Sequence, residues 1–313
     1  MIDLLQSKKK IVINSDIDGI LSGLMLQEFL GCEVVGFSNS ADKLWISEDQ
    51  YEYRKEFVFI DMFVSPENLA CIDQHIVSFN EEHNKRLASN PQKINPNIIR
   101  GRYFFPQNSY YSKYPFGTVH FIIAELERNN IDLSRLSLFK EGHELHSIDF
   151  FLRADDALLT SVKNYPQNAK DWWNWLLKYS AQGSTTQQFI NYTYSGLNAE
   201  HNKRTVTQKL KGEPFYCEKS DGGFVEIADS ENSLIPNFKL YVDYLAEITN
   251  LSPLNIPGEY KIVEGIAERT NFNKEHSETF VNESKIFDKK IFSYAFVKSF
   301  GQENSLSYTH SLK

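Results

Sequence analysis

The sequence predicts an α/β fold in which a parallel sheet is flanked by helices and followed by a second, smaller α+β domain. Short β-branched runs alternate with polar turns over the first 75 of the 313 residues, and a helix-like segment follows the first of these runs. Strand-like runs return only after residue 212. Two domains agree with this chain length, because a domain usually holds about 150 residues.

Four short apolar runs are expected to form buried strands of the parallel sheet. They are too short and too apolar for amphipathic helices, and they cover residues 10–14, 33–37, 57–60 and 69–72. Residues 19–30 carry apolar side chains at helical spacing. The chain should therefore open with a strand followed by a helix.

Beyond residue 75 the pattern changes from one segment to the next. Residues 80–115 are rich in Asn and Pro, which predicts a long surface loop that could cover a substrate. Helical spacing returns at 116–128 and 139–159, and strand-like runs at 215–217 and 223–228 come later. We divide the chain into a first domain of residues 1–195, a linking helix of residues 196–212 and a small α+β domain of residues 213–313.

Composition and charge argue against several classes of protein. The 33 basic residues face 41 acidic ones, and the net charge of −8 does not favour binding of nucleic acid or anionic membrane by charge alone. Cys32, Cys71 and Cys217 lie far apart without Cys-x-x-Cys spacing, which argues against disulfides and a thiolate zinc site. Because no long apolar run or signal-like segment is found, we expect a cytoplasmic protein without a membrane partner.

Acidic residues follow three of the four predicted strands. Asp16 and Asp18 follow the first, Asp61 follows the third, and Asp73 follows the fourth with His75 two residues later. Ligands of open α/β sheets bind beyond the carboxyl ends of the strands. Two carboxylates about 4 Å apart repel by on the order of 4 kcal/mol at an effective dielectric near 20, so such a cluster requires a metal ion or a proton. Any one of these residues could instead cap a turn or helix, but together they predict a site for Mn²⁺ or Mg²⁺.

The segments that carry these residues resemble motifs of the DHH phosphoesterase superfamily. NSDIDGILSG (14–23) resembles its first motif, the strand end at Asp61 its second, and IDQH (72–75) its third. KYPFGT (113–118) and RADDALL (153–159) are similar to later segments of that family. The resemblance covers roughly residues 10–160 and implies a hydrolase that uses two divalent cations to cleave phosphodiester or phosphoanhydride bonds.

The resemblance also implies a role for each acidic residue. Asp16 and Asp18 would each bind a metal ion, and Asp61 would bridge the two ions. Either Asp155 or Asp156 would complete the second metal position. His75 would face the phosphate that is cleaved.

Two positions depart from the family pattern. Gln74 stands where the family has a metal-binding His, and Asn14 stands where it has an acidic or His ligand. Both amides keep a carbonyl oxygen but lose charge or basicity. Metal affinity could therefore be weaker, or one of the two metal positions could be empty.

The expected function is metal-dependent hydrolysis of a nucleotide or a short single-stranded oligonucleotide, of the kind an exonuclease performs, with one or two Mn²⁺ or Mg²⁺ ions. Asp61 would hold the attacking water, and His75 would stabilise charge on the phosphoryl oxygens. Four basic residues are candidates for binding substrate phosphate, two in the loop and two in the linker: Arg100, Arg102, Lys203 and Arg204.

Two alternatives remain open at this point. Haloacid dehalogenase-type phosphatases also carry DxDG after a strand, but they have Thr where Ile20 stands and a hydrophobic residue where Ser15 stands, and this reading leaves Asp61 unexplained. The other alternative is a degenerate relative that binds a nucleotide or a protein without catalysis. Asn14 and Gln74 favour it, whereas the several polar groups kept at one sheet edge argue against it.

Overall fold

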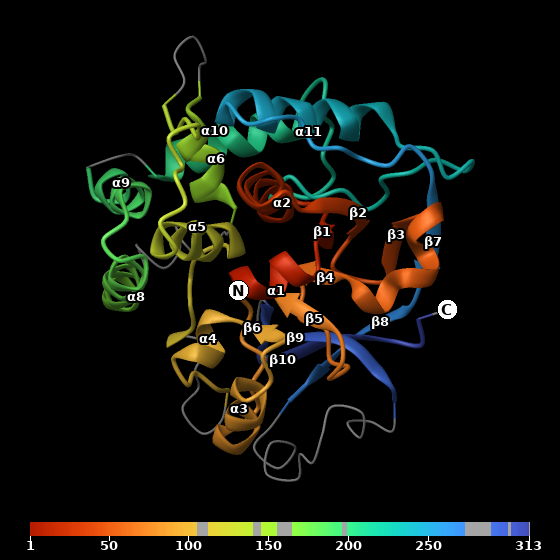
Figure 1. Cartoon of the computed structure of the whole chain (residues 1–313), viewed down its shortest axis with the longest axis horizontal. Coiled ribbons are helices and arrows are strands. Elements are labelled where there is room, and N and C mark those ends of the chain that lie inside the picture. Colours follow the sequence, from red (N-terminus) through yellow and green to blue (C-terminus); the bar gives the residue numbers. More distant parts are fainter. Residues whose placement is uncertain are drawn as a thin grey trace.

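The computed structural model describes residues 1–104, 112–139, 145–154, 165–195, 199–272, 289–299 and 302–312. A seven-stranded mixed sheet flanked by helices forms its centre, and a three-stranded antiparallel sheet lies beside it (Figure 1). The predicted α/β class with a mostly parallel sheet is therefore confirmed. In the part of the chain that is described, no helix has both the length and the apolar character required to cross a bilayer.

The large sheet has the strand order β6–β5–β4–β1–β2–β3–β7. Neighbouring strands run parallel from β6 to β2, whereas β3 runs antiparallel to both β2 and β7. All four strands expected from the sequence are present. The strands are β1 (Lys10–Asn14), β2 (Glu33–Ser38), β3 (Lys43–Ser47), β4 (Val58–Ile60), β5 (Ala70–Ile72), β6 (Lys93–Ile94) and β7 (Tyr260–Glu264).

Helices cover one face of this sheet and bury the larger of two hydrophobic cores. Side chains alternate along a strand, so Ile11 and Ile13 of β1 point into this core while Val12 points into the other. In Figure 1 the helices α2, α6, α10 and α11 lie above the strands. The helices that contribute to this core are α1 (Ile2–Ser7), α2 (Ile17–Leu30), α5 (Thr118–Arg128), α6 (Ser147–Arg153), α8 (Pro166–Tyr179), α9 (Ser184–Thr193), α10 (Ala199–Lys211) and α11 (Pro236–Thr249).

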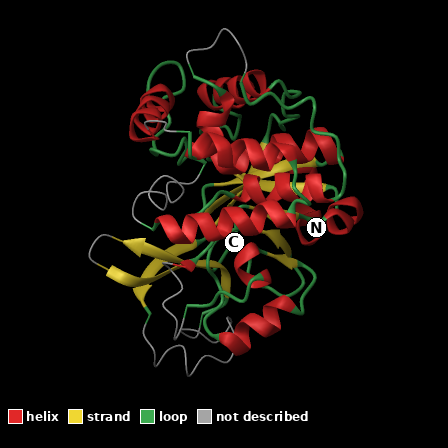
Figure 2. Cartoon of the chain, turned by 90° about the vertical axis from the view of Figure 1, so that its left-hand side faces the viewer, coloured by secondary structure: helices red, strands yellow, loops and turns green. Residues whose placement is uncertain are grey.

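The three-stranded sheet covers the opposite face of the large sheet, below the helical layer (Figure 2). Its order is β8–β10–β9, all antiparallel, with β8 at Ile266–Asn271, β9 at Ile291–Ser299 and β10 at Gln302–His310. Phe292 and Tyr294 of β9 pack edge-on against Phe59 and Phe63, with ring centroids 5.6 and 4.9 Å apart. The small sheet is thus anchored beside the carboxyl ends of the parallel strands.

The prediction of a long surface loop over residues 80–115 is wrong for much of the described part of this range. It contains α3 (Glu81–Ala88), β6 and α4 (Pro96–Ile99). Two of the Asn residues in this range are helix caps: the side chains of Asn80 and Asn95 accept hydrogen bonds from the first turns of α3 and α4. Residues 105–111 lie outside the described part of the chain.

The region after residue 212 contributes to both sheets. Helix α11 is part of the helical layer, and its Phe238 and Tyr241 pack into the larger core between that layer and the large sheet. Strand β7 pairs with β3 at the edge of the large sheet. The strands expected at 215–217 and 223–228 are wrong, because turns and loops stand there. Tyr216 and Gly222 have φ values of 53° and 81°, and residues in this left-handed region interrupt an extended run. The linking helix expected at 196–212 corresponds to α10 where it is described.

A buried histidine in α5 should make the stability of the fold sensitive to acid. His120 has no exposed surface and lies among the rings of Phe116, Trp173 and Phe189. Burial lowers its pKa from 6.5 to about 3. The unfolded chain therefore binds this proton at a higher pH than the folded chain, and the stability that neutral His120 contributes is lost as the pH falls below 6.5.

We therefore expect His120→Leu to reduce the loss of stability on acidification, by up to about 1.4 kcal/mol for each pH unit below the unfolded pKa. Urea denaturation of parent and variant across this pH range measures the difference. Parallel pH profiles of the free energy of unfolding would contradict the prediction.

Candidate functional site

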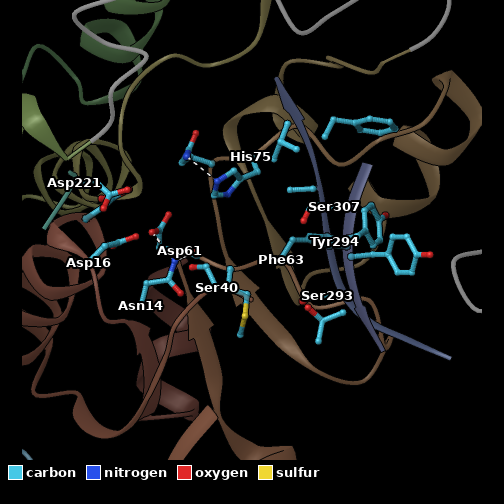
Figure 3. Close-up of a pocket in the computed structure, with 18 of the residues that line it drawn as sticks. Asn14, Asp16, Ser40, Asp61, Phe63, His75, Asp221, Ser293, Tyr294 and Ser307 are labelled. Atoms are coloured by element: carbon cyan, nitrogen blue, oxygen red, sulfur yellow. Dashed lines mark hydrogen bonds between the residues drawn. The ribbon is translucent and has the colours of Figure 1, made fainter. Parts of the chain in front are cut away.

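A cavity of about 530 Å³ lies between the carboxyl ends of the parallel strands and the small sheet (Figure 3). One wall carries the acidic and amide side chains that follow β1, β4 and β5, together with His75. The other wall is formed by β9 and β10, through Ser293, Tyr294 and Ser307 among others. The cavity has the size of a small-ligand site, and its lining is rich in charge.

Asp61 lies on the wall of this cavity and is held from both sides. It directly follows β4 with a φ of 60°, and its side chain is 3% exposed. Thr118 Oγ1 donates to its Oδ1 at 2.8 Å, and Asn14 Nδ2 donates to its Oδ2 at 2.9 Å. Burial, followed by the charges of Asp18 and Asp16, raises the pKa of Asp61 well above its usual value. Each carboxylate oxygen keeps a lone pair for a further ligand.

Asp16 and Asp18 stand at the start of α2, and both act as helix caps. Asp16 Oδ1 accepts from the Gly19 N–H at 3.0 Å. The two oxygens of Asp18 accept from the N–H groups of Thr118 and Val119 at 2.7 and 2.9 Å, at the start of α5. The capping role considered for these residues is thus present, and it holds both carboxylates on the cavity wall.

Asp73 and His75 form a hydrogen-bonded pair after β5, in which Asp73 is buried and His75 is partly exposed. Asp73 is fully buried, and its Oδ1 lies 2.7 Å from His75 Nδ1. Burial opposes protonation of His75, but the charge of Asp73 and this hydrogen bond outweigh it and raise the pKa of His75 to about 9. Atoms of Asp61, Asp73 and His75 that can ligate a metal all lie within 4.8 Å of one another. The sequence shows Asp73 as an acidic residue that follows a strand, but it does not predict that Asp73 binds His75.

The two amides that depart from the family pattern both line the cavity. Gln74 is fixed through its backbone oxygen, which accepts from Asn97 Nδ2 at 2.7 Å. Gln74 Oε1 and Asn14 Oδ1 are buried without a hydrogen-bond partner. A buried acceptor left unsatisfied costs about 1–3 kcal/mol, so a donor or cation bound next to these two oxygens would be stabilised by them.

Sequence reasoning missed Asp221, which reaches the site from the other half of the chain. Figure 3 shows it beside Asp16 on the cavity wall. Its backbone oxygen accepts from the Ile17 N–H at 3.3 Å, and its Oδ1 accepts from the Gly223 N–H at 3.1 Å. Burial and the charge of Asp221 raise the pKa of Asp16 to about 6. Its sequence context, SDGGF, indicates only a turn, so no local signal relates it to Asp16.

Three cationic side chains also line the cavity: Lys113, Lys219 and Arg269. Lys219 Nζ donates to the Asn39 backbone oxygen at 2.9 Å. Its positive charge lowers the pKa of Asp16, but burial and the charge of Asp221 raise that pKa by more. Arg269 stands on β8, opposite Ser307 of β10. Lys113 lies in the KYPFGT segment, whose sequence predicts no separate role for this lysine.

The four predicted phosphate-binding residues are not among the residues that line the cavity. Arg100 and Arg102 pack over the ring of Trp172, while Lys203 and Arg204 lie on α10. Asp155 and Asp156 fall outside the described residues. Ala154, which precedes them, lines the cavity.

Comparison with known proteins returned no family model, no curated protein and no solved structure that matches the chain. The chemistry of the site must therefore follow from its own residues.

Asp61→Asn should leave the folded protein at least as stable as the parent at neutral pH when a chelator is present. Because the pKa of Asp61 is raised on folding, its ionised carboxylate costs stability at neutral pH, and this cost disappears in Asn. Asn can keep both contacts, accepting from Asn14 Nδ2 and donating to Thr118 Oγ1.

Urea denaturation in EDTA measures this effect. Asp243→Asn, on the exposed side of α11 where Asp243 contacts Lys239, is the matched control and should stay within about 0.5 kcal/mol of the parent. An Asp61→Asn protein less stable than the parent by more than about 1 kcal/mol would show that the carboxylate is needed for the fold.

Proposed function

We propose that the protein is a divalent-metal-dependent phosphoester hydrolase that acts on a nucleotide or a short single-stranded oligonucleotide. The observation that carries the proposal is the concentration of buried carboxylates at one sheet edge. Asp18, Asp61 and Asp73 are each at most 3% exposed, and Asp16 stands beside them. Buried charge of one sign is costly unless a cation compensates it.

The donor set fits Mn²⁺ or Mg²⁺. It consists of carboxylate oxygens with one imidazole nearby, and it contains no thiolate, because none of the three cysteines lines the cavity. Asp61 would be the central ligand, with Asp16 and Asp221 on one side of it. The unsatisfied oxygens of Asn14 and Gln74 are neutral donors of the same chemical kind. The resemblance of the surrounding segments to the DHH superfamily supports the same proposal.

A bound divalent cation supplies a water of lowered pKa and polarises a phosphoryl oxygen. The protein's own residues supply the rest. Asp61 would orient the attacking water while Asn14 and Thr118 hold its carboxylate in place. Asp73 binds Nδ1 of His75 and orients the ring. The other ring nitrogen, Nε2, lies 3.4 Å from Gln74 Nε2 and would donate to a phosphoryl oxygen as negative charge develops there.

The opposite wall suits the remainder of a phosphate-bearing substrate. Ser293 and Ser307 offer hydroxyl groups, and Lys113, Lys219 and Arg269 offer positive charge. These groups are few and local, while the chain as a whole carries a net charge of −8. A small nucleotide or a single strand therefore fits better than long duplex DNA, whose binding depends on many phosphate contacts.

The parent protein should hydrolyse bis(p-nitrophenyl) phosphate with Mn²⁺ and not with EDTA. Asp61→Asn and His75→Gln should each lower kcat by about 100-fold or more, because each removes a group that acts on the reacting atoms. Saturating Mn²⁺ should also raise the thermal midpoint of the parent, but raise that of Asp61→Asn much less.

Asp243→Asn serves again as the control and should retain both the activity and the Mn²⁺-induced stabilisation. Hydrolysis by Asp61→Asn at the parental rate would refute the role of Asp61. A parent protein that neither gains stability with Mn²⁺ nor hydrolyses a panel of phosphodiesters and phosphoanhydrides would refute the proposed function.

A nucleotide-binding module without catalytic activity is the second candidate, and the orientation of Asn14 favours it. The amide nitrogen of Asn14, and not its oxygen, faces Asp61. Asn14 thus stabilises the Asp61 carboxylate by hydrogen bonding, as a neutral donor can do without a metal ion.

Gln74→His distinguishes the two candidates. A neutral imidazole is a better ligand for Mn²⁺ than an amide oxygen, so this change should tighten Mn²⁺ binding and raise activity at low Mn²⁺ if the site is catalytic. Calorimetric titration of Mn²⁺ into both proteins, with the same hydrolysis assay, measures this. Unchanged Mn²⁺ binding and absent hydrolysis in both proteins would favour the binding module.

A further inference from the structure

Two arginines at the end of α4 share the face of one tryptophan outside the cavity. The guanidinium carbon of Arg100 lies 4.3 Å from the ring centroid of Trp172, and that of Arg102 lies 6.0 Å from the same ring. Gly101 between them has a φ of 63°, a conformation that favours glycine. This turn lets side chains two positions apart reach the same ring.

The positive charge of this pair is not neutralised by the part of the chain that the structure describes. Neither guanidinium group forms an ion pair or a hydrogen bond there, and Arg100 Nη1 and Arg102 Nε are buried without a partner. Burial and the positive charge of Arg102 lower the pKa of Arg100, and the negative charge of Asp171 raises it by less. Two neighbouring guanidinium groups without an acceptor are unfavourable, and an anion would satisfy both.

The arginine pair is connected to the cavity wall on two sides. Trp172 Nε1 donates to the Ser112 backbone oxygen at 3.0 Å, and the next residue, Lys113, lines the cavity. The Arg102 N–H donates to the Asn97 backbone oxygen at 2.8 Å, and Asn97 in turn binds the backbone of Gln74. The pair is therefore connected to Lys113 through Trp172 and Ser112, and to Gln74 through Asn97.

We propose that Arg100 and Arg102 bind a phosphate group of the substrate other than the one that is hydrolysed. The inference rests on the proposed function and predicts a preference for substrates that carry at least two phosphates. A guanidinium group presents its N–H donors in a planar fork that matches two phosphate oxygens, and an aromatic ring stacked on its face uses none of these donors. The second phosphate could belong to an oligonucleotide or to a nucleoside polyphosphate, which the experiment distinguishes.

The test compares Arg100→Gln and Arg102→Gln with Arg128→Gln. Arg128 is the matched control, because it also stacks on an aromatic ring, 4.6 Å from the centroid of Tyr179, and does not line the cavity. Binding of fluorescent hexathymidylate is measured by anisotropy in EDTA, with ATP as competitor. Hydrolysis with Mn²⁺ is measured for hexathymidylate and for thymidine 5′-(p-nitrophenyl phosphate), which has a single phosphate.

Each of the two variants should weaken binding of hexathymidylate about tenfold and flatten its dependence on log salt concentration by about 0.7, as expected for one lost phosphate contact on a single strand. The ratio of kcat/KM for hexathymidylate to that for the single-phosphate ester should fall by a similar factor. Arg128→Gln should match the parent. ATP should compete poorly if the second phosphate belongs to an oligonucleotide, and well if it belongs to a nucleoside polyphosphate.

Parental binding by both variants, or an equal loss of kcat/KM on the two substrates, would overturn the inference. If Arg100→Gln does not fold, Arg102→Gln carries the test, since its guanidinium lies farther from the ring. A parent that binds hexathymidylate through this pair but hydrolyses nothing would refute the proposed function and leave the anion site standing. A parent that hydrolyses the single-phosphate ester but binds neither hexathymidylate nor ATP would support the proposed function and refute the anion site at Arg100 and Arg102.

Discussion

The arrangement of the site depends on the contacts that Asp18 and Asp61 make with the start of α5. Asp18 accepts two backbone N–H groups of this helix, and Asp61 accepts the hydroxyl of Thr118 in the same turn. Gly117 permits this approach, because a Cβ at that position would lie 2.8 Å from an Asp18 oxygen. These bonds join the start of α2 and the end of β4 to the start of α5, and they fix both carboxylates on the cavity wall.

This junction concentrates negative charge, and that charge should make the folded protein less stable at neutral pH than its packing alone would allow. The pKa values of Asp16 and Asp61 are both raised, first by burial and then by neighbouring carboxylates. A purely structural role could be performed by neutral side chains at the same hydrogen-bonding positions. Retaining ionisable groups at such a cost is typical of sites that bind a cation or perform catalysis.

The small sheet gives the site its second wall, and its register decides what that wall presents. On β10, Leu306 packs into the core while the next residue, Ser307, lines the cavity; on β9, Phe296 belongs to the core and also borders the cavity. Backbone contacts of Ser65 with Phe292 and of Ile76 with Phe296 attach this sheet to the loops after β4 and β5. The two walls are therefore held at a set separation, as binding of a small ligand requires.

The sequence by itself determined the α/β class, the four parallel strands and the side chains that follow them. These features are local: alternation, run length and the residue after each strand are visible without knowledge of the fold. Asp16, Asp18, Asp61, Gln74 and His75 could be placed at one edge because parallel strands deliver their ends to the same side of a sheet.

Only the tertiary structure decided which other residues join them. Asp221 lies beside Asp16 because its turn is bound to the start of α2, and Arg269 reaches the cavity because β8 pairs with β10. The sequence predicts Arg100 and Arg102 as candidates for phosphate binding, but their shared position over Trp172 depends on the docking of α8 against the end of α4. Contacts between segments so distant in the chain leave no periodic pattern in either segment. Their physical cause is the packing of whole elements against one another.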